Sequence, residues 1–272
     1  MSAIQPNAQQ FNPNQLNLVH VATYEREIGV PLVRVWENVL DWEHLPWLHR
    51  TSFDYVELDA GGDWGWRTWS DPEHLSHVEL TRADQHRYVA RSYRAGTQAS
   101  EIWTELTDFG DTTGVSVTFH IADVTEAASD NVGAAMIRLY TRLWDEDEAM
   151  MQERHRRLHE DRALATEVDL GEYDSLRQAV QQGERVVFQL QRREYQLAQD
   201  KDELTCHSTI CPHLLGPLQT GSEPGELFCA WHGYRFNRDT GDCTFPAEAT
   251  CRLSPPPDLT IENGRLIARS VR

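Results

Sequence analysis

Hydrophobic and polar residues alternate along much of the first 120 residues, a pattern typical of half-buried β-strands. A first strand is predicted at Val19–Ile28, and a helix follows at Pro31–His44, where the proline suits a first helical turn. Five further alternating runs come after it, and glycine-containing turns precede the first and the last of them. These runs are Trp64–Trp69, Ser76–Thr81, Tyr88–Tyr93, Glu101–Leu106 and Val115–Ile121.

A long stretch with helical periodicity covers Asn131–Arg162. The order of strand, helix, several antiparallel strands and a long final helix predicts an α+β domain, in which a curved sheet grips one long helix. We assign residues 18–165 to this domain. Residues 1–17, rich in Gln, Asn and Pro, are predicted to be a flexible tail.

The pattern changes in the last third of the chain. Residues 166–184 are polar and helical in character and are predicted to be a linker. Residues 185–272 contain short strands and turns, which predict a small all-β domain. Its closing hairpin is expected to join Leu259–Ile261 to Arg265–Ala268 through the turn Asn263-Gly264.

Composition limits the possible partners and the compartment. The chain has 272 residues, 40% of them hydrophobic, and a formal net charge of −18. This charge argues against nucleic acid or an anionic membrane as a partner. No apolar run approaches the ~20 residues that span a bilayer, and no export signal is visible, so we expect a cytoplasmic protein.

Two short Cys/His pairs near the C-terminus carry metal-ligand chemistry. Cys211 and His213 form the first pair, and Cys229 and His232 form the second. Zinc sites usually place both histidines in one pair, whereas each pair here is mixed. A disulfide framework is also disfavoured, because the chain has five cysteines. Two cysteines and two histidines are the ligand set of a Rieske [2Fe–2S] cluster.

The segments Cys211-Pro212-His213-Leu214-Leu215-Gly216 and Cys229-Ala230-Trp231-His232-Gly233-Tyr234 closely resemble the two ligand loops of the Rieske family. The resemblance implies that Cys211 and Cys229 bind one iron and that His213 and His232 bind the other. Respiratory Rieske proteins add a disulfide between the loops, whose cysteines would fall at Gly216 and Trp231. Because both of these cysteines are absent, the motif resembles that of the soluble ferredoxin or oxygenase type.

Histidines and carboxylates also cluster around the end of the first predicted helix. On one ideal helix His44 and His49 would lie about 140° apart and could not share a metal ion. Pro46 lies between them and disfavours a continuous helix. We therefore expect His44 to end one helix and His49 to approach from the next turn, so that both can reach one ion.

Asp41, His44 and His49, preceded by Glu37-Asn38, resemble the iron motif of Rieske non-haem oxygenases. The resemblance implies a helix-grip (START-like) catalytic domain whose mononuclear Fe(II) is bound by the two histidines. It also implies that Asp41 bridges a Rieske histidine to an iron-bound histidine. The domain order is permuted, because in typical members of the family the Rieske domain comes first.

The family's third iron ligand is an aspartate on a late helix, for which Asp145 and Asp147 are candidates. Helical periodicity places Asp147 within an apolar stripe and Asp145 on the opposite face, so Asp147 is the predicted ligand. A buried aspartate needs a metal or a charged partner. Arg154 lies in the same arc, so an Asp147–Arg154 ion pair is the alternative explanation.

These features suggest an oxidoreductase, a Rieske-type mono- or dioxygenase. It would take electrons from a reductase or ferredoxin, activate O₂ and oxidise a small apolar substrate. The alternative is a Rieske electron-transfer protein fused to an iron-free helix-grip domain that binds a ligand. Homo-oligomerisation is possible under either hypothesis.

Overall fold

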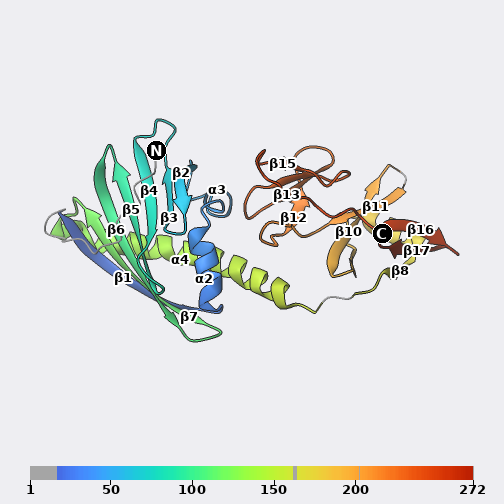
Figure 1. The fold of residues 1–272 in the computed structure, drawn as a ribbon, viewed down its shortest axis with the longest axis horizontal. Coiled ribbons are helices and arrows are strands. Elements are labelled where there is room, and N and C mark those ends of the chain that lie inside the picture. The colour runs from blue at the N-terminus through green and yellow to red at the C-terminus, as the bar shows by residue number, and fades with distance from the viewer. Residues whose placement is uncertain (1–16, 162–163, 202, 272) are drawn as a thin grey trace. The chain divides into compact units, whose positions relative to one another are not determined.

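A computed structural model describes residues 17–161, 164–201 and 203–271. The chain divides into two compact units, Met1–His155 and Arg156–Arg272, whose elements are labelled in Figure 1. Apart from Asn17, the predicted tail 1–17 lies outside the described residues.

The first unit is built on a seven-stranded antiparallel sheet with the strand order β1-β7-β6-β5-β4-β3-β2. Every strand from β2 to β7 pairs with its neighbour in sequence, and β1 pairs with β7 along nearly its whole length. The alternating pattern predicted six of the seven strands, and β2 was missed. The strands are β1 (Leu18–Ile28), β2 (Glu57–Gly62), β3 (Gly65–Trp69), β4 (Ser76–Arg82), β5 (Arg87–Arg94), β6 (Thr97–Asp108) and β7 (Thr113–Ala122).

The long helix α4 (Glu126–His159) packs on one face of this sheet (Figure 1). The core between them is formed by inward-facing strand residues such as Val117 and Phe119 and by Trp144 and Met151 of the helix. The α+β, helix-grip architecture predicted from the element order is thus confirmed. Within the described ranges, no helix has a stretch long and apolar enough to cross a membrane.

The first helix ends earlier than predicted. Helix α2 (Leu32–Leu40) stops before Asp41, whose backbone is extended and whose Oδ1 accepts a hydrogen bond from the Glu43 N–H, at 2.9 Å. This local side-chain turn replaces the next helical hydrogen bond. A second short helix, α3 (Leu45–Leu48), then begins with Pro46 in its first turn. The chain therefore breaks at Asp41, and Pro46 starts the next helix.

In its described residues, the second unit contains three small sheets and one complete helix. Helix α5 (Tyr173–Gln181) and the strands β8 to β11 and β17 enclose a core that includes Phe188, Leu197 and Leu266. Strands β12, β13, β14 and β15 form a separate four-stranded sheet, paired in that order. The strands are β8 (Glu167–Glu172), β9 (Val187–Leu190), β10 (Arg193–Asp200), β11 (Glu203–Ser208), β12 (Leu218–Thr220), β13 (Glu226–Cys229), β14 (Arg235–Asn237), β15 (Cys243–Phe245), β16 (Asp258–Glu262) and β17 (Arg265–Arg269).

The structure differs from the sequence prediction in segment 166–184, which is folded and does not act as a simple linker. Strand β8 pairs antiparallel with β17, so the chain's last strand completes a sheet begun about 100 residues earlier. Leu176 and Val180 of α5 pack on the core of the second unit. The predicted closing hairpin is present, and positive φ angles at Asn263 and Gly264 are those of a type I′ turn.

Gly133 allows α4 to lie close to the sheet. A Cβ atom at this position would come within 2.3 Å of the Val21 carbonyl oxygen on β1 and 3.2 Å of the Ala22 Cβ. Both neighbours belong to the strand itself, so they cannot turn away as the end of a long side chain could. The absence of a side chain therefore sets how closely the helix approaches the sheet.

The substitution Gly133→Ala is expected to lower the free energy of unfolding by about 1–3 kcal/mol through overpacking. The sign is diagnostic, because a Gly-to-Ala change in a helix otherwise stabilises by about 1 kcal/mol. Urea denaturation followed by tryptophan fluorescence measures the change. Asn131→Ala, on an exposed position of α4, is the control, and equal stabilisation by both substitutions would contradict the close contact.

Candidate metal centres

Two loops of the second unit carry the paired cysteines and histidines. The first loop links β11 to β12, and the Cys211 N–H donates to the Gly216 carbonyl across it, at 2.8 Å. The second links β13 to β14, and there the Cys229 N–H donates to the Tyr234 carbonyl, also at 2.8 Å. Each loop is thus closed by its own backbone, which holds its Cys and His side chains in place.

The two cysteine thiols meet in the interior. Cys211 and Cys229 are both fully buried, and their side chains hydrogen-bond to each other. Hydrogen bonding from Cys211 lowers the pKa of the Cys229 thiol, and the same contact raises the pKa of Cys211. The pair therefore favours a thiolate, which is the form that binds metals.

The two histidines face each other from the same loops. The ring centroids of His213 and His232 lie 4.7 Å apart at an interplanar angle of 82°. Tyr234 stacks on His213 at 4.5 Å and so limits the rotation of that ring. Two thiols and two imidazoles on facing loops are the donor set of a Rieske [2Fe–2S] cluster, so the residues present fit that group.

Gly216 and Trp231, the positions at which respiratory relatives carry a disulfide, are in contact here. A Cβ at Gly216 would lie 2.7 Å from the Cys229 sulfur and 3.0 Å from the Trp231 ring. Trp231 is itself buried. The indole packed on the glycine therefore joins the two loops where no disulfide is formed.

His44 and His49 lie at the two ends of the short helix α3. Their ring centroids are 5.1 Å apart, and both side chains are almost completely buried. The break after α2 makes this possible, because the two residues no longer belong to one continuous helix. Their convergence agrees with the expectation from Pro46, although the first helix ends at Leu40 and not at His44.

Asp147 of α4 completes a three-residue cluster with these histidines. Its Oδ1 lies 3.0 Å from the His49 Nε2 and 3.6 Å from the His44 Nε2. One ligand atom from each of the three residues lies within 4.8 Å of the other two. Two imidazoles and one carboxylate converging on one point can hold Fe(II) and leave other coordination positions open.

The neighbouring charged residues have other partners. Asp145 is 59% exposed and pairs with Arg26 at 2.6 Å, as the helical phase predicted for the outer face. Arg154, the alternative partner considered for Asp147, instead binds Glu37 at 2.7 Å. Asp147, 13% exposed, therefore faces the histidines.

Three further side chains orient the cluster. Asp41 Oδ2 lies 3.5 Å from the Nδ1 of His44, and Glu146 Oε2 lies 2.6 Å from the Nδ1 of His49. Because each carboxylate contacts the far nitrogen of its ring, both Nε2 atoms point toward Asp147. The Asn38 side-chain amide donates to Asp147 Oδ1 at 2.9 Å. Sequence reasoning missed Glu146, since the only signal was an acidic run on a helix.

The electrostatics of this cluster favour its charged forms. Burial alone would raise the pKa of Asp147, but hydrogen bonding and the charges of His49 and His44 lower it below its ordinary value. Burial would likewise lower the pKa of His49, and its contacts with Asp147 and Glu146 raise it. Both shifts therefore favour the ionised carboxylate of Asp147 and the protonated form of His49.

A cavity of about 830 Å³ opens between the sheet and α4 and includes all three residues of the cluster in its wall. Its wall includes apolar residues such as Leu80, Ile102 and Leu143. Large, mostly apolar cavities with a few converging polar groups are the usual form of small-molecule sites.

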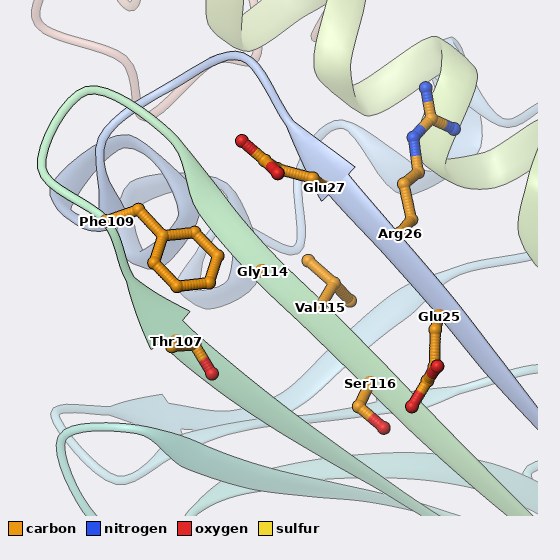
Figure 2. Close-up of a pocket in the computed structure, with 8 residues that line it drawn as sticks. All are labelled: Glu25, Arg26, Glu27, Thr107, Phe109, Gly114, Val115 and Ser116. Carbon is orange, nitrogen blue, oxygen red and sulfur yellow. The ribbon is translucent and has the colours of Figure 1, made fainter.

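A second depression lies on the outer face of the same sheet, across β1, β6 and β7 (Figure 2). The Phe109 ring lies beside Gly114 there, and Glu25 and Glu27 extend from β1. This depression is open and smaller, at about 410 Å³, and none of the cluster residues lines it. The enclosed cavity is therefore the better candidate for a substrate.

Replacing Gly216 by Ala is expected to displace the Cys229 sulfur or the Trp231 ring, and so to reduce cluster loading. Visible absorption and EPR of the reduced cluster per chain measure the effect. Gly225→Ala is the matched control, because Gly225 has a positive φ of 77° and no atom near its Cβ position. That change costs about 1–2 kcal/mol of backbone strain but touches no ligand. Normal loading in Gly216→Ala would refute the close contact.

Loss of the Glu146 carboxylate is expected to weaken divalent-metal binding at the three-residue cluster by roughly 10–100-fold, because His49 loses the group that orients it. Mn²⁺ titration followed by the EPR signal of free Mn²⁺ measures affinity in the intact chain. Asp145→Ala, the neighbouring exposed acid, is the control. If Glu146→Ala and Asp145→Ala bind Mn²⁺ equally well, Glu146 does not position the ligand.

Comparisons with known proteins agree with the second unit's donor set. The family described as Rieske [2Fe-2S] domain matches residues 172–255. A ferredoxin of carbazole 1,9a-dioxygenase from Nocardioides aromaticivorans IC177 is 22% identical, with coverage of 39% of this chain and 100% of its own and a TM-score of 0.30. No curated protein matches.

The solved structures that match the first part of the chain include the following two. Norcoclaurine synthase from Thalictrum flavum is 17% identical over 56% of this chain and 98% of its own, with a TM-score of 0.37. A START superfamily protein from Mycobacterium smegmatis is 13% identical over 50% of this chain and 99% of its own, with a TM-score of 0.36. Residues 172–255 of this chain form a Rieske [2Fe–2S] domain, and a helix-grip region precedes it.

Proposed function

We propose that this protein is a Rieske-type oxygenase that takes electrons from a reductase or ferredoxin and oxidises a small, largely apolar organic substrate with O₂. The observation that carries the proposal is the convergence of His44, His49 and Asp147 in the wall of a cavity, in a chain that also contains a Rieske domain. An electron relay and an iron-type ligand set are the two parts that such a reaction needs.

His44, His49 and Asp147 would hold the mononuclear iron, and Cys211, His213, Cys229 and His232 would hold the [2Fe–2S] cluster. When bound, the mononuclear iron supplies the site at which O₂ is activated. For a C–H substrate the overall change is balanced by two electrons and two protons. One oxygen atom enters the C–H bond as a hydroxyl group, and the other leaves as water.

The chain's own residues set the ligand geometry. Glu146 accepts a hydrogen bond from the Nδ1 of His49, and Asp41 Oδ2 lies 3.5 Å from the Nδ1 of His44, so each ring presents Nε2 to the centre. Asn38 holds the Asp147 carboxylate by donating to Oδ1. Asp41 lies at the turn after α2, where it serves in this proposal as the link between His44 and a Rieske histidine.

The cavity supports an apolar substrate. Val78, Leu80 and Ile102 from the sheet and Leu143 from α4 contribute apolar side chains to its wall. Tyr88 lies at the same end, and its burial raises the pKa of its phenol, so it remains neutral. A C–H or C=C bond of a substrate held there would lie among side chains that are not ionised.

A second function has an observation in its favour. Asp147 already accepts hydrogen bonds from Asn38 and His49, so the cluster is satisfied as a buried ion pair without iron. Under this alternative the first unit binds a ligand without iron, and the Rieske domain transfers electrons to another protein.

Iron content separates the two functions. Chain reconstituted anaerobically with excess Fe(II) and sulfide is expected to hold three irons, two of them in the Rieske cluster. The double substitution His44→Ala/His49→Ala should hold two and retain the visible and EPR signature of the cluster. Total iron and acid-labile sulfide per chain, measured after desalting, give the count.

The double substitution His74→Ala/His86→Ala removes two exposed histidines of the same unit and should leave three irons. Two irons in the unmodified chain would refute the mononuclear site and leave the electron-transfer alternative. Oxygen uptake with a reductase and candidate substrates then tests turnover in the three-iron protein.

A further inference from the structure

The cavity in the first unit is elongated, and its two ends differ. Tyr88, Ala90, Ser92 and Arg94 line it from alternate positions of β5, a span of about 20 Å at the rise of a β-strand. On α4 the lining residues extend from Asp147 to Met136, about 16 Å along a helix. Two independent elements therefore both indicate a cavity about 16–20 Å long.

The metal-ligand end is identified by contacts. Asp147 lies there, and its charge acts on the Tyr88 phenol. The first lining residue of β5 and that of α4 are therefore at the same end of the cavity. At the other end, Arg94 and Thr97 face each other across the β5–β6 hairpin, and both are exposed. The cavity thus runs from a buried metal-ligand cluster to an open rim.

The rim carries hydrogen-bond donors, and deeper along β5 the donor Arg91 is already paired with Glu101. Ser92 lies two residues before Arg94 on β5, and its hydroxyl is 2.6 Å from the hydroxyl of Ser100 on β6. Beyond them the wall becomes apolar, with Ala90 opposite Ile102. A ligand filling the cavity therefore meets polar groups at its outer end and apolar groups along its body.

Arg94 is a cation available to a ligand. The chain has 43 acidic and 25 basic residues, so most arginines of this sheet find a carboxylate. Arg67 pairs with Asp59, Arg87 with Asp84 and Arg91 with Glu101. In the described part of the chain, by contrast, Arg94 has neither an ion pair nor a side-chain hydrogen bond.

Asp123 lies at the same rim and has the opposite charge. It follows the end of β7 at a positive φ of 58°, outside the strand ladder. Arg94 lies within the ladder, on the face of β5 that Ser92 presents to the cavity. Arg94 is thus the better placed of the two, and its planar guanidinium can bind a carboxylate through two hydrogen bonds.

We propose that the cavity binds an elongated, largely apolar carboxylate, with its carboxylate at Arg94 and its far end beside His44, His49 and Asp147. Binding depends only on the cavity. The consequence for reaction rests on the proposed function, because oxidation would occur at the end of the substrate furthest from its carboxylate.

The test uses two fluorescent probes that share one apolar body, 1-pyrenebutyrate and the neutral 1-pyrenebutanol. Dissociation constants are measured with the full chain by quenching of tryptophan fluorescence, since Trp66 and Trp144 line the cavity. In the unmodified chain the carboxylate should bind more tightly than the alcohol, and added salt should reduce the difference.

The substitution Arg94→Gln should weaken 1-pyrenebutyrate binding by about tenfold, the low end for a charged hydrogen bond at an exposed site, and leave 1-pyrenebutanol unchanged. Arg94→Lys should weaken 1-pyrenebutyrate binding less than Arg94→Gln does, because lysine keeps the positive charge. Arg138→Gln, on an exposed position of α4 outside the cavity, should change neither probe.

Equal binding of the two probes, or unchanged 1-pyrenebutyrate binding in Arg94→Gln, would overturn the proposal. Stronger carboxylate binding in Asp123→Asn with no effect of Arg94→Gln would overturn it too. The variant His44→Ala/His49→Ala should retain the carboxylate preference. Two irons in the unmodified chain together with a retained carboxylate preference would refute the oxygenase alone, and three irons without that preference would refute the carboxylate site alone.

Discussion

Burial of the Asp147 carboxylate is the constraint on which the first unit depends. A buried carboxylate without partners costs several kcal/mol, so it is retained only where donors or cations compensate it. Asn38 and the two histidines provide that compensation from α2 and from both ends of α3. The same contacts therefore hold three helical elements together and bring the metal-type ligands to one point.

The break after Leu40 follows from the same requirement. A continuous helix would turn His44 and His49 to different faces, whereas the Asp41 turn and the short α3 helix let both rings reach Asp147. Asp41 and Glu146 then fix which nitrogen each ring presents. The cluster is thus ordered by a second layer of carboxylates, as metal-binding histidines commonly are.

In the second unit, order at the cysteine and histidine pairs comes mainly from backbone hydrogen bonds and close packing. Each loop closes on itself through a cysteine N–H, and the Gly216–Trp231 contact joins the two loops. The Trp231 indole, packed on Gly216, joins the two loops in place of a disulfide. This arrangement keeps two thiols and two imidazoles together in a chain whose five cysteines are all free.

The amino-acid sequence by itself determined the features that have a local signature. Alternation predicted six strands of the main sheet, helical phase turned Asp147 inward and Asp145 outward, and the Cys/His spacing predicted the Rieske domain. These patterns depend on the geometry of one strand, one helix or one loop. The ligand roles of His44, His49 and Asp147 stay predictions, although their side chains converge.

Only the tertiary structure decided the rest. Strand β8 pairs with β17, and Glu146 contacts His49, although each pair is about 100 residues apart in the sequence. The position of Arg94 at a cavity rim depends on the whole sheet. An acidic run or a polar connector looks the same whether its residues are solvated or buried. Its role is set by which distant surface packs against it, because burial turns an ordinary charge into one that must find a partner.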